Sequence, residues 1–141
     1  MEEVKLKPVL PMDEANYRER LIFGREFDPR NYKGGICQFE NMSYRQAVDL
    51  MARGLLSPQE KQNEAPTVQA FIDFVAAHDP DRWYLHGYVV SPYRADVRIS
   101  VEGIRSLGSI ADHDMVDFLR TFRKADTLFA EDGEPVYCWY D

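Results

Sequence analysis

The 141-residue sequence has few of the residues that build disulfide frameworks, and it has no long apolar run. Its two cysteines, Cys37 and Cys138, are not part of any Cys-x-x-Cys pair, which excludes a disulfide framework and gives no sign of zinc or redox chemistry. No apolar run reaches the roughly 18 residues that a membrane span needs. The start, Met-Glu-Glu-Val-Lys, lacks the basic end and apolar stretch of a secretory signal. We therefore expect a cytoplasmic protein with reduced cysteines and no membrane association.

Motifs for nucleotide binding and nucleophilic catalysis are missing as well. No Gly-x-Ser-x-Gly, Walker A or Gly-x-Gly-x-x-Gly pattern occurs, and Gly34-Gly35 is not followed by Lys-Ser or Lys-Thr. Two of the three histidines, His78 and His113, precede an aspartate, but the phosphohydrolases that use such pairs are all-helical and need further histidines. His86, Cys37 and Cys138 have no local spacing typical of zinc ligands. We expect no cofactor and no metal, and the sequence favours a protein without catalytic activity.

Positive charge is scarce relative to negative charge. Lysine and arginine total 17 against 24 aspartates and glutamates, so the net charge is −7, and residues 71–141 account for −6 of it. This excess of negative charge opposes the electrostatic attraction on which nucleic-acid binding rests, and it opposes docking on anionic lipid. It would suit a basic protein partner, although acidic proteins also use such charge for solubility. We therefore expect no direct contact with nucleic acid or membrane.

The length fits a single domain, in which residues 1–42 form an irregular N-terminal segment before an α+β core at 43–141. Prolines 8 and 11 are expected to stop a short extended piece over residues 4–10. Asp13 is a candidate cap for a helix over residues 14–23 that ends at Gly24. Residues 25–35 are rich in turn-forming asparagine, proline and glycine and predict a loop.

Three helices are predicted between residues 43 and 78. Ser43 and Gln46 form a capping box that begins a helix ending near Gly54. Ser57-Pro58 is typical of a helix start and predicts a short helix to about residue 63. An apolar stripe at helical spacing predicts a third helix from Thr67 to about residue 78, before Asp79-Pro80.

The remaining residues predict two β-hairpins separated by a helix. Residues 83–90 and 96–104 are expected to form the first hairpin, residues 110–124 a helix, and residues 127–130 with 136–140 the second hairpin. The order α-α-α-β-β-α-β-β predicts a four-stranded, mainly antiparallel sheet with packed helices. The fold class is therefore α+β.

Two of the predicted strands are apolar on both faces. One face of residues 83–90 carries Tyr84, His86 and Tyr88, and the matching face of the last strand carries Tyr137 and Trp139. Helices can cover only one side, so these five residues form a face that the first 60 residues, a partner or second subunit, or a ligand must cover. They are our candidate partner- or ligand-binding residues.

The stretch His86-Gly-Tyr-Val-Val-Ser-Pro92, the stretch Val97 to Ile104, and the ending Ala125 to Asp141 resemble a group of small bacterial proteins of unknown function, some of them on mobile elements. The resemblance covers about residues 40–141. It implies a bacterial cytoplasmic accessory protein and brings with it no activity and no site residue.

Three functional hypotheses follow. The first is a non-catalytic domain that binds another protein or itself through the aromatic sheet face. The second is a small hydrolase with His86 or His113 as acid or base beside a carboxylate. The third is an acidic protein that imitates nucleic acid, which would need carboxylates lined along one face at phosphate-like spacing.

Overall fold

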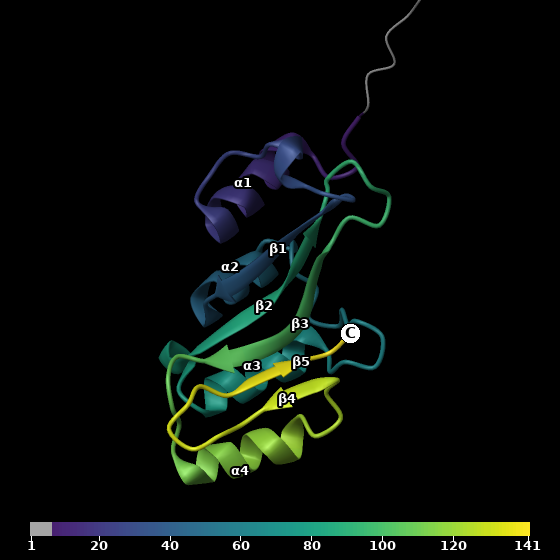
Figure 1. Ribbon diagram of the computed structural model, residues 1–141. Coiled ribbons are helices and arrows are strands. Elements are labelled where there is room, and N and C mark those ends of the chain that lie inside the picture. The colour runs from purple at the N-terminus through teal and green to yellow at the C-terminus, as the bar shows by residue number, and fades with distance from the viewer. Residues whose placement is uncertain (1–6) are drawn as a thin grey trace, which may run out of the picture.

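A computed structural model describes residues 7–141, which form four α-helices and one five-stranded antiparallel sheet (Figure 1). The predicted α+β class is therefore confirmed, whereas the predicted count of four strands is wrong. Along the sheet the strand order is β1-β2-β3-β5-β4. Within residues 7–141 no helix is long and apolar enough to cross a membrane.

The additional strand is β1, Ile36–Met42, which lies within the segment predicted to be irregular. It pairs antiparallel with β2, Trp83–Val90, and the register shifts between Phe39 and Met42. Phe39 and Met42 are both buried and are three residues apart. The strand therefore lacks the alternation of inward and outward side chains, with a period of two residues, that identifies a strand in a sequence. The bulge thus explains why the pattern did not predict this strand.

The centre of the sheet is the hairpin of β2 with β3, Ile99–Ser106. Residues 83–90 were predicted with the bounds that the structure shows, but β3 begins three residues later than expected. The connection is longer because Arg94 N–H donates to the Ser91 carbonyl, Val97 N–H donates to the Arg94 carbonyl, and Arg94 pairs with Asp96. These bonds hold residues 91–97 in turns, so they do not extend the strand pairing between β2 and β3.

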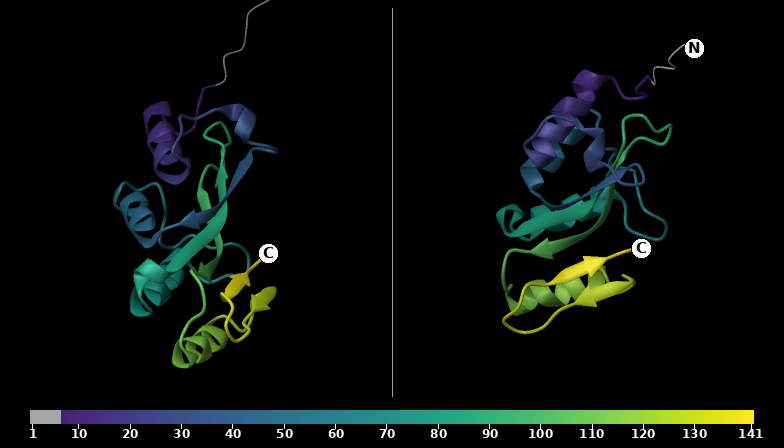
Figure 2. Two further views of the ribbon diagram at one scale, coloured as in Figure 1. Left: turned by 60° about the vertical axis from the view of Figure 1, so that its left-hand side comes forward. Right: turned by 45° about the horizontal axis from the view of Figure 1, so that its top comes forward.

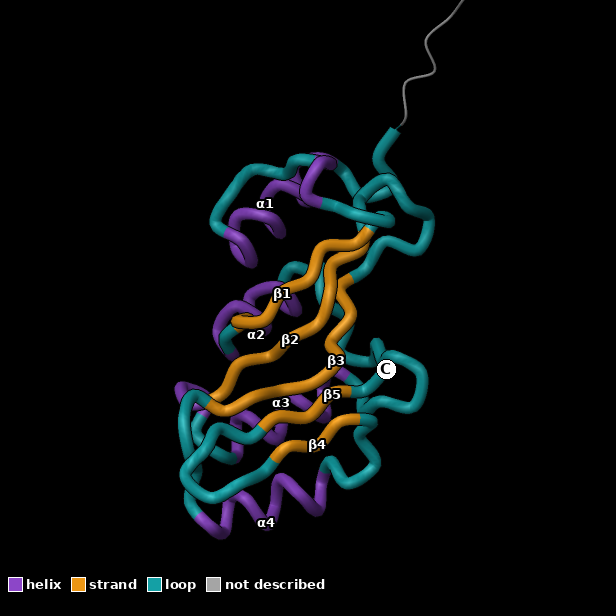
Figure 3. Tube along the Cα trace, viewed as in Figure 1, coloured by secondary structure: helices purple, strands orange, loops and turns teal. Residues whose placement is uncertain are grey.

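The second predicted hairpin is present but short, with β4 at Thr127–Phe129 and β5 at Tyr137–Trp139. It joins the sheet through β5, which pairs with β3 between Arg105 and Tyr137. Figure 3 shows these two strands beyond β3, at the end of the sheet farthest from β1.

All four helices lie on one face of the sheet (Figure 2, left). They are α1, Met12–Phe23; α2, Tyr44–Ala52; α3, Val68–Ala77; and α4, Asp112–Thr121. Stacked and edge-on aromatic rings from α3, α4 and β2 fill the space beneath them: Phe71, Phe74, Phe118, Phe122 and Trp83. The hydrophobic core therefore occupies one side of the sheet only.

The capping box at Ser43 begins α2 as predicted, with both reciprocal bonds to Gln46 formed. The predicted end of α1 is also confirmed, because Gly24 takes the left-handed conformation with φ 68°. The extended piece predicted over residues 4–10 falls partly outside the described residues. In the described part, Val9 and Leu10 form no strand and donate their N–H groups to the Pro92 carbonyl.

The short helix predicted after Ser57-Pro58 is wrong. Two turns form instead, in which Glu60 N–H donates to the Ser57 carbonyl and Ala65 N–H donates to the Gln62 carbonyl. Val68 N–H donates to the Glu60 carbonyl and Gln69 N–H to the Pro58 carbonyl, both at 2.9 Å. These long-range bonds use the carbonyls that a continuing helix would need, so residues 57–66 form a compact loop.

A buried polar cluster attaches α1 to the sheet. The guanidinium of Arg18 donates to the Val90 carbonyl at 2.9 Å, and the carboxylate of Glu19 accepts from Arg25 Nε at 3.0 Å and from the Tyr32 hydroxyl. Burial, together with the bond to Glu19, raises the pKa of Tyr32 above its usual range. Tyr32 therefore stays a hydrogen-bond donor to a fully buried carboxylate.

Candidate functional site

The face of the sheet opposite the helices carries the candidate site. Trp83, Leu85 and Val89 of β2 point into the helix-covered core, so the alternate residues lie on the other face. Figure 2 shows that no helix packs on that side of the strands. The five aromatic candidates of the sequence lie there in three places.

Three of the five candidates surround a hollow of about 350 Å³, which we call the central hollow: His86, Tyr137 and Trp139. The other two lie outside it. Tyr88 lies beside Gln62 and Arg98, and Tyr84 lies beneath the guanidinium of Arg105, whose carbon is 5.5 Å from the ring centre.

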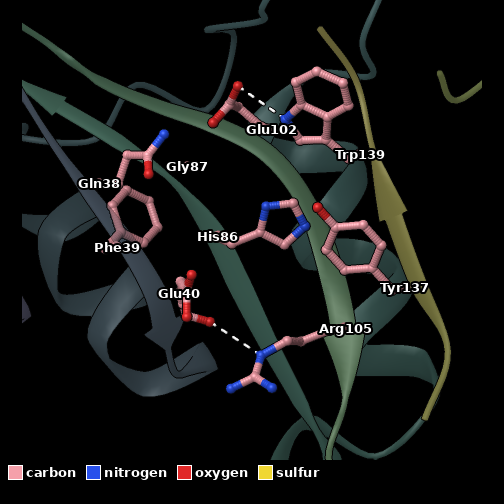
Figure 4. A pocket seen from close by; sticks show the side chains of 9 residues that line it. All are labelled: Gln38, Phe39, Glu40, His86, Gly87, Glu102, Arg105, Tyr137 and Trp139. Atoms are coloured by element: carbon pink, nitrogen blue, oxygen red, sulfur yellow. Dashed lines mark hydrogen bonds between the residues drawn. The ribbon is translucent and has the colours of Figure 1, made fainter. Parts of the chain in front are cut away.

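Four strands contribute to the central hollow, and its charged groups are separated along it (Figure 4). His86 of β2 forms the centre, with Glu102 at one end and Arg105 at the other, both from β3. The aromatic pair from β5 forms one side. Opposite them, β1 contributes Gln38 and Glu40.

His86 is held at the centre by a bond that crosses β3. Its Nε2 lies 2.8 Å from the carbonyl of Cys138 on β5, and its ring stacks on Tyr137 with centroids 4.9 Å apart. Burial lowers the pKa of His86, the Cys138 bond opposes this, and Arg105 lowers it further. The ring is therefore neutral at neutral pH, with the proton on Nε2, and Nδ1 is an acceptor without a hydrogen-bond partner among residues 7–141.

Gly103 makes this crossing possible. A Cβ at this position would lie 1.9 Å from the Cys138 carbonyl oxygen and 2.7 Å from His86 Nε2. The imidazole therefore occupies space that any other residue would fill. The pairing residue of Gly103 on β2 is His86 itself.

Glu102 is the additional residue of a bulge in β3. His86 pairs with Gly103 and Gly87 pairs with Val101, which leaves Glu102 without a partner on β2. Its Oε2 accepts from the Trp139 indole at 3.1 Å and from the Gln62 amide at 3.4 Å. Glu102 is 9% exposed, and burial together with the charge of Asp141 raises its pKa overall, although the Trp139 bond opposes this. Its Oε1 has no hydrogen-bond partner within the described chain.

Arg105 is directed towards β1. Its Nε donates to the Glu40 carbonyl at 3.3 Å, and its Nη2 donates to the side chain of Asn41. Figure 4 shows the guanidinium beside Glu40, at the end of the central hollow away from Glu102. Two of its five N–H donors thus bond to β1.

Among residues 7–141, the part of the chain that covers this face is the loop before α3. The Gln62 amide oxygen accepts from Tyr88 at 2.6 Å and from Ser100 at 2.8 Å, and Arg98 pairs with Glu60 at 3.5 Å. The helices among the first 60 residues pack on the opposite face. The loop therefore covers Tyr88 and leaves the central hollow open.

The remaining candidates for chemistry lie elsewhere. The His113 side chain is 82% exposed and pairs with its neighbour Asp114 at 3.3 Å. His78 bonds to the Phe74 carbonyl and to Asp117 between α3 and α4. Cys138 is buried, burial raises its pKa to about 12, and it is a free thiol, as is Cys37. No group of three potential metal ligands occurs among the residues that the structure describes.

Sequence reasoning did not single out Glu102, Arg105 or Gln62 as site residues. The one signal in the sequence is that polar and apolar residues alternate over residues 96–104, which puts Glu102 on the polar side. Arg105 lies beyond the predicted end of that strand, and Gln62 falls in the loop predicted as a helix. Contacts between distant segments decide the roles of all three.

A scan against protein-family models, a search of curated proteins and a search of solved structures each found no match to this chain. The resemblance over residues 40–141 therefore stays a prediction.

Proposed function

We propose that this protein is a non-catalytic domain that binds a protein partner on the open face of its sheet. The observation that carries the proposal is the central hollow itself, where Tyr137 and Trp139 flank a neutral imidazole on a face without helices. Tyrosine and tryptophan are enriched at the centres of interfaces, where each contributes a large apolar surface and one polar group. A polar rim of Gln38 and Glu40 completes this arrangement.

Charge favours a partner other than a second copy of the chain. Each copy carries a net charge of −7, so two copies facing each other across this surface would repel. The central hollow is also concave, and two identical hollows do not fill one another. A basic partner with a protruding side chain matches both properties.

The hydrolase hypothesis has less support at this site. His86 lies in a hollow with carboxylates, as that hypothesis requires, but its Nε2 bonds to the Cys138 carbonyl, and no carboxylate hydrogen-bonds to its ring within residues 7–141. A lowered pKa also makes it a weak base. The nucleic-acid mimic needs a face of one sign, whereas this face mixes Glu102 with Arg98 and Arg105.

The test compares capture of cellular proteins by the wild type and by two variants. Trp139→Ala, on the open face, should lose the captured protein, because the indole forms one side of the central hollow. Val116→Ala, at an exposed position of α4, should retain it. Circular dichroism checks that both variants are folded, and size-exclusion chromatography reports self-association. Capture that is absent, or equal for all three proteins, contradicts the proposal, as does a stable dimer that Trp139→Ala disrupts.

A further inference from the structure

We infer that the central hollow receives the guanidinium group of an arginine side chain presented by a basic protein partner. This inference rests on the proposed function and specifies the chemistry that the partner must supply. It depends on the free acceptors of the hollow, on its aromatic side and on its charge.

Two free groups near the centre of the hollow, His86 Nδ1 and Glu102 Oε1, are acceptors, and the Tyr137 hydroxyl beside His86 can donate or accept. His86 Nδ1 is unprotonated because Nε2 carries the proton that bonds to Cys138, and Glu102 keeps Oε1 free. Two N–H donors, from Trp139 and Gln62, already bond to Oε2 of the same carboxyl group. Glu102 is thus held in place as an acceptor, and a ligand must bring donors. A guanidinium has five, in one plane.

The aromatic side of the hollow suits a flat cation. Tyr137 and the His86 ring are stacked with 16° between their planes, and Trp139 adjoins them. Guanidinium groups stack on aromatic faces more readily than ammonium groups do. The same face already contains two such pairs, with Arg105 over Tyr84 and Arg98 over Tyr88.

Arg105 does not convert the hollow into an anion site. Its guanidinium is bonded to the Glu40 carbonyl and to Asn41, so it lies at the β1 end and not beside Glu102. Glu40 and Glu102 together outnumber it among the lining charges. A carboxylate or phosphate would be repelled by this excess of negative charge in the hollow and by the net charge of −7 of the chain.

The experiment is an NMR titration of the full chain with N-acetyl-arginine amide. The indole N–H of Trp139 and the ring signals of His86 report on the hollow. We expect saturable shifts at both, with binding about fivefold or more tighter than for N-acetyl-citrulline amide, which has the same shape without charge. N-acetyl-lysine amide should bind more weakly than arginine. Equal binding of citrulline, or stronger binding of N-acetyl-glutamate amide, overturns the inference.

Two variants test the role of the carboxyl group. Glu102→Gln should weaken arginine binding about fivefold, whereas Glu131→Gln, which removes one charge from an exposed turn, should leave it unchanged. Equal effects of the two variants contradict a local contact. If the arginine derivative fails to bind while Trp139→Ala still abolishes capture of a partner, the arginine chemistry is wrong and the proposed function stands. If Trp139→Ala has no effect on capture, the proposed function fails independently.

Discussion

At the scale of single residues, two glycines determine how closely the strands and side chains of the open face approach. A Cβ at Gly87 would lie 1.9 Å from the Ser100 carbonyl oxygen, and one at Gly103 would lie equally close to the Cys138 carbonyl. Both positions lie at the bulge of β3, next to Glu102. The missing side chain of Gly103 allows the His86 ring to cross β3 and bond to β5, and that of Gly87 allows β2 and β3 to approach each other.

Replacing Gly103 by alanine should destabilise the protein by about 1–3 kcal/mol or more, because the methyl group forces either β5 or the imidazole to move. Urea denaturation measures the change. The control is Gly133→Ala in the β4–β5 turn, where a Cβ meets no atom within 4 Å and only the positive φ opposes the substitution. If Gly103→Ala lowered the free energy of unfolding by less than Gly133→Ala does, the added methyl group would be accommodated beside Cys138 and His86 without cost.

A second prediction concerns the hydroxyl of Tyr32. Tyr32→Phe removes a donor from the buried carboxylate of Glu19 and should lower the free energy of unfolding by about 1–3 kcal/mol. Tyr93→Phe is the matched control, because Tyr93 is 37% exposed and its hydroxyl has no hydrogen bond within residues 7–141. Equal stability of the two variants, measured by chemical denaturation, contradicts the role assigned to the cluster.

At the scale of elements, the helix starts differ in how their N–H groups are satisfied. Ser43 caps α2 with a complete capping box, whereas Ala111 precedes α4 without a side-chain cap, in the extended conformation that a capping residue takes. Ser43→Ala should cost about 1 kcal/mol, and Ala111→Ser should stabilise the protein by about 0.5–1 kcal/mol. Thermal unfolding measures both, and changes of the same sign would contradict the assignment.

The contact between α3 and α4 depends on pH through His78. Burial lowers the pKa of His78, but the bonds to the Phe74 carbonyl and to Asp117, with the charge of Asp114, raise it overall above its ordinary value. The stabilisation is therefore complete below about pH 6.5, the unfolded value, and is lost as the pH rises through the folded pKa. Because Asp117 is half exposed, the effect stays below about 1 kcal/mol.

The measurement compares the free energy of unfolding of the wild type and of Asp117→Asn at about pH 6 and about pH 8. The difference between the two proteins should be larger at the lower pH. NMR titration of the rings gives an independent check, with His78 titrating above and His86 below the ordinary histidine value. A larger difference at the higher pH would show that protonated His78 is not stabilised by Asp117.

Elements whose signals lie within their own sequence were predictable. The β2 strand begins with two aromatic residues and ends with one aromatic and two β-branched residues, and the start of α2 depends on two residues three apart. The β1 strand depends on a bulge, and the loop at 57–66 depends on bonds to α3. Neither is specified by local spacing, so both predictions failed. In the site, alternation located the aromatic residues, whereas the partners of Glu102 and Arg105 required the folded chain.

At the scale of the whole molecule, the one-sided placement of helices leaves an acidic chain with an open sheet face. Long-range attraction should then contribute to the rate at which a basic partner associates. We expect this rate to fall steeply as salt is raised, while the dissociation rate changes little, as surface plasmon resonance with a captured partner would measure. A rate of association that is independent of salt contradicts a basic partner.

The bulge in β3 has a consequence for the tolerance of the chain to a change in length. Without Glu102, the pairs of His86 with Gly103 and of Gly87 with Val101 would become consecutive. Val101 and Ile104 would still reach the core, because the in-and-out order of their neighbours is kept. Deleting this one codon should therefore yield a regular and folded sheet that lacks the acidic end of the hollow. The sheet therefore does not need the irregularity in order to fold.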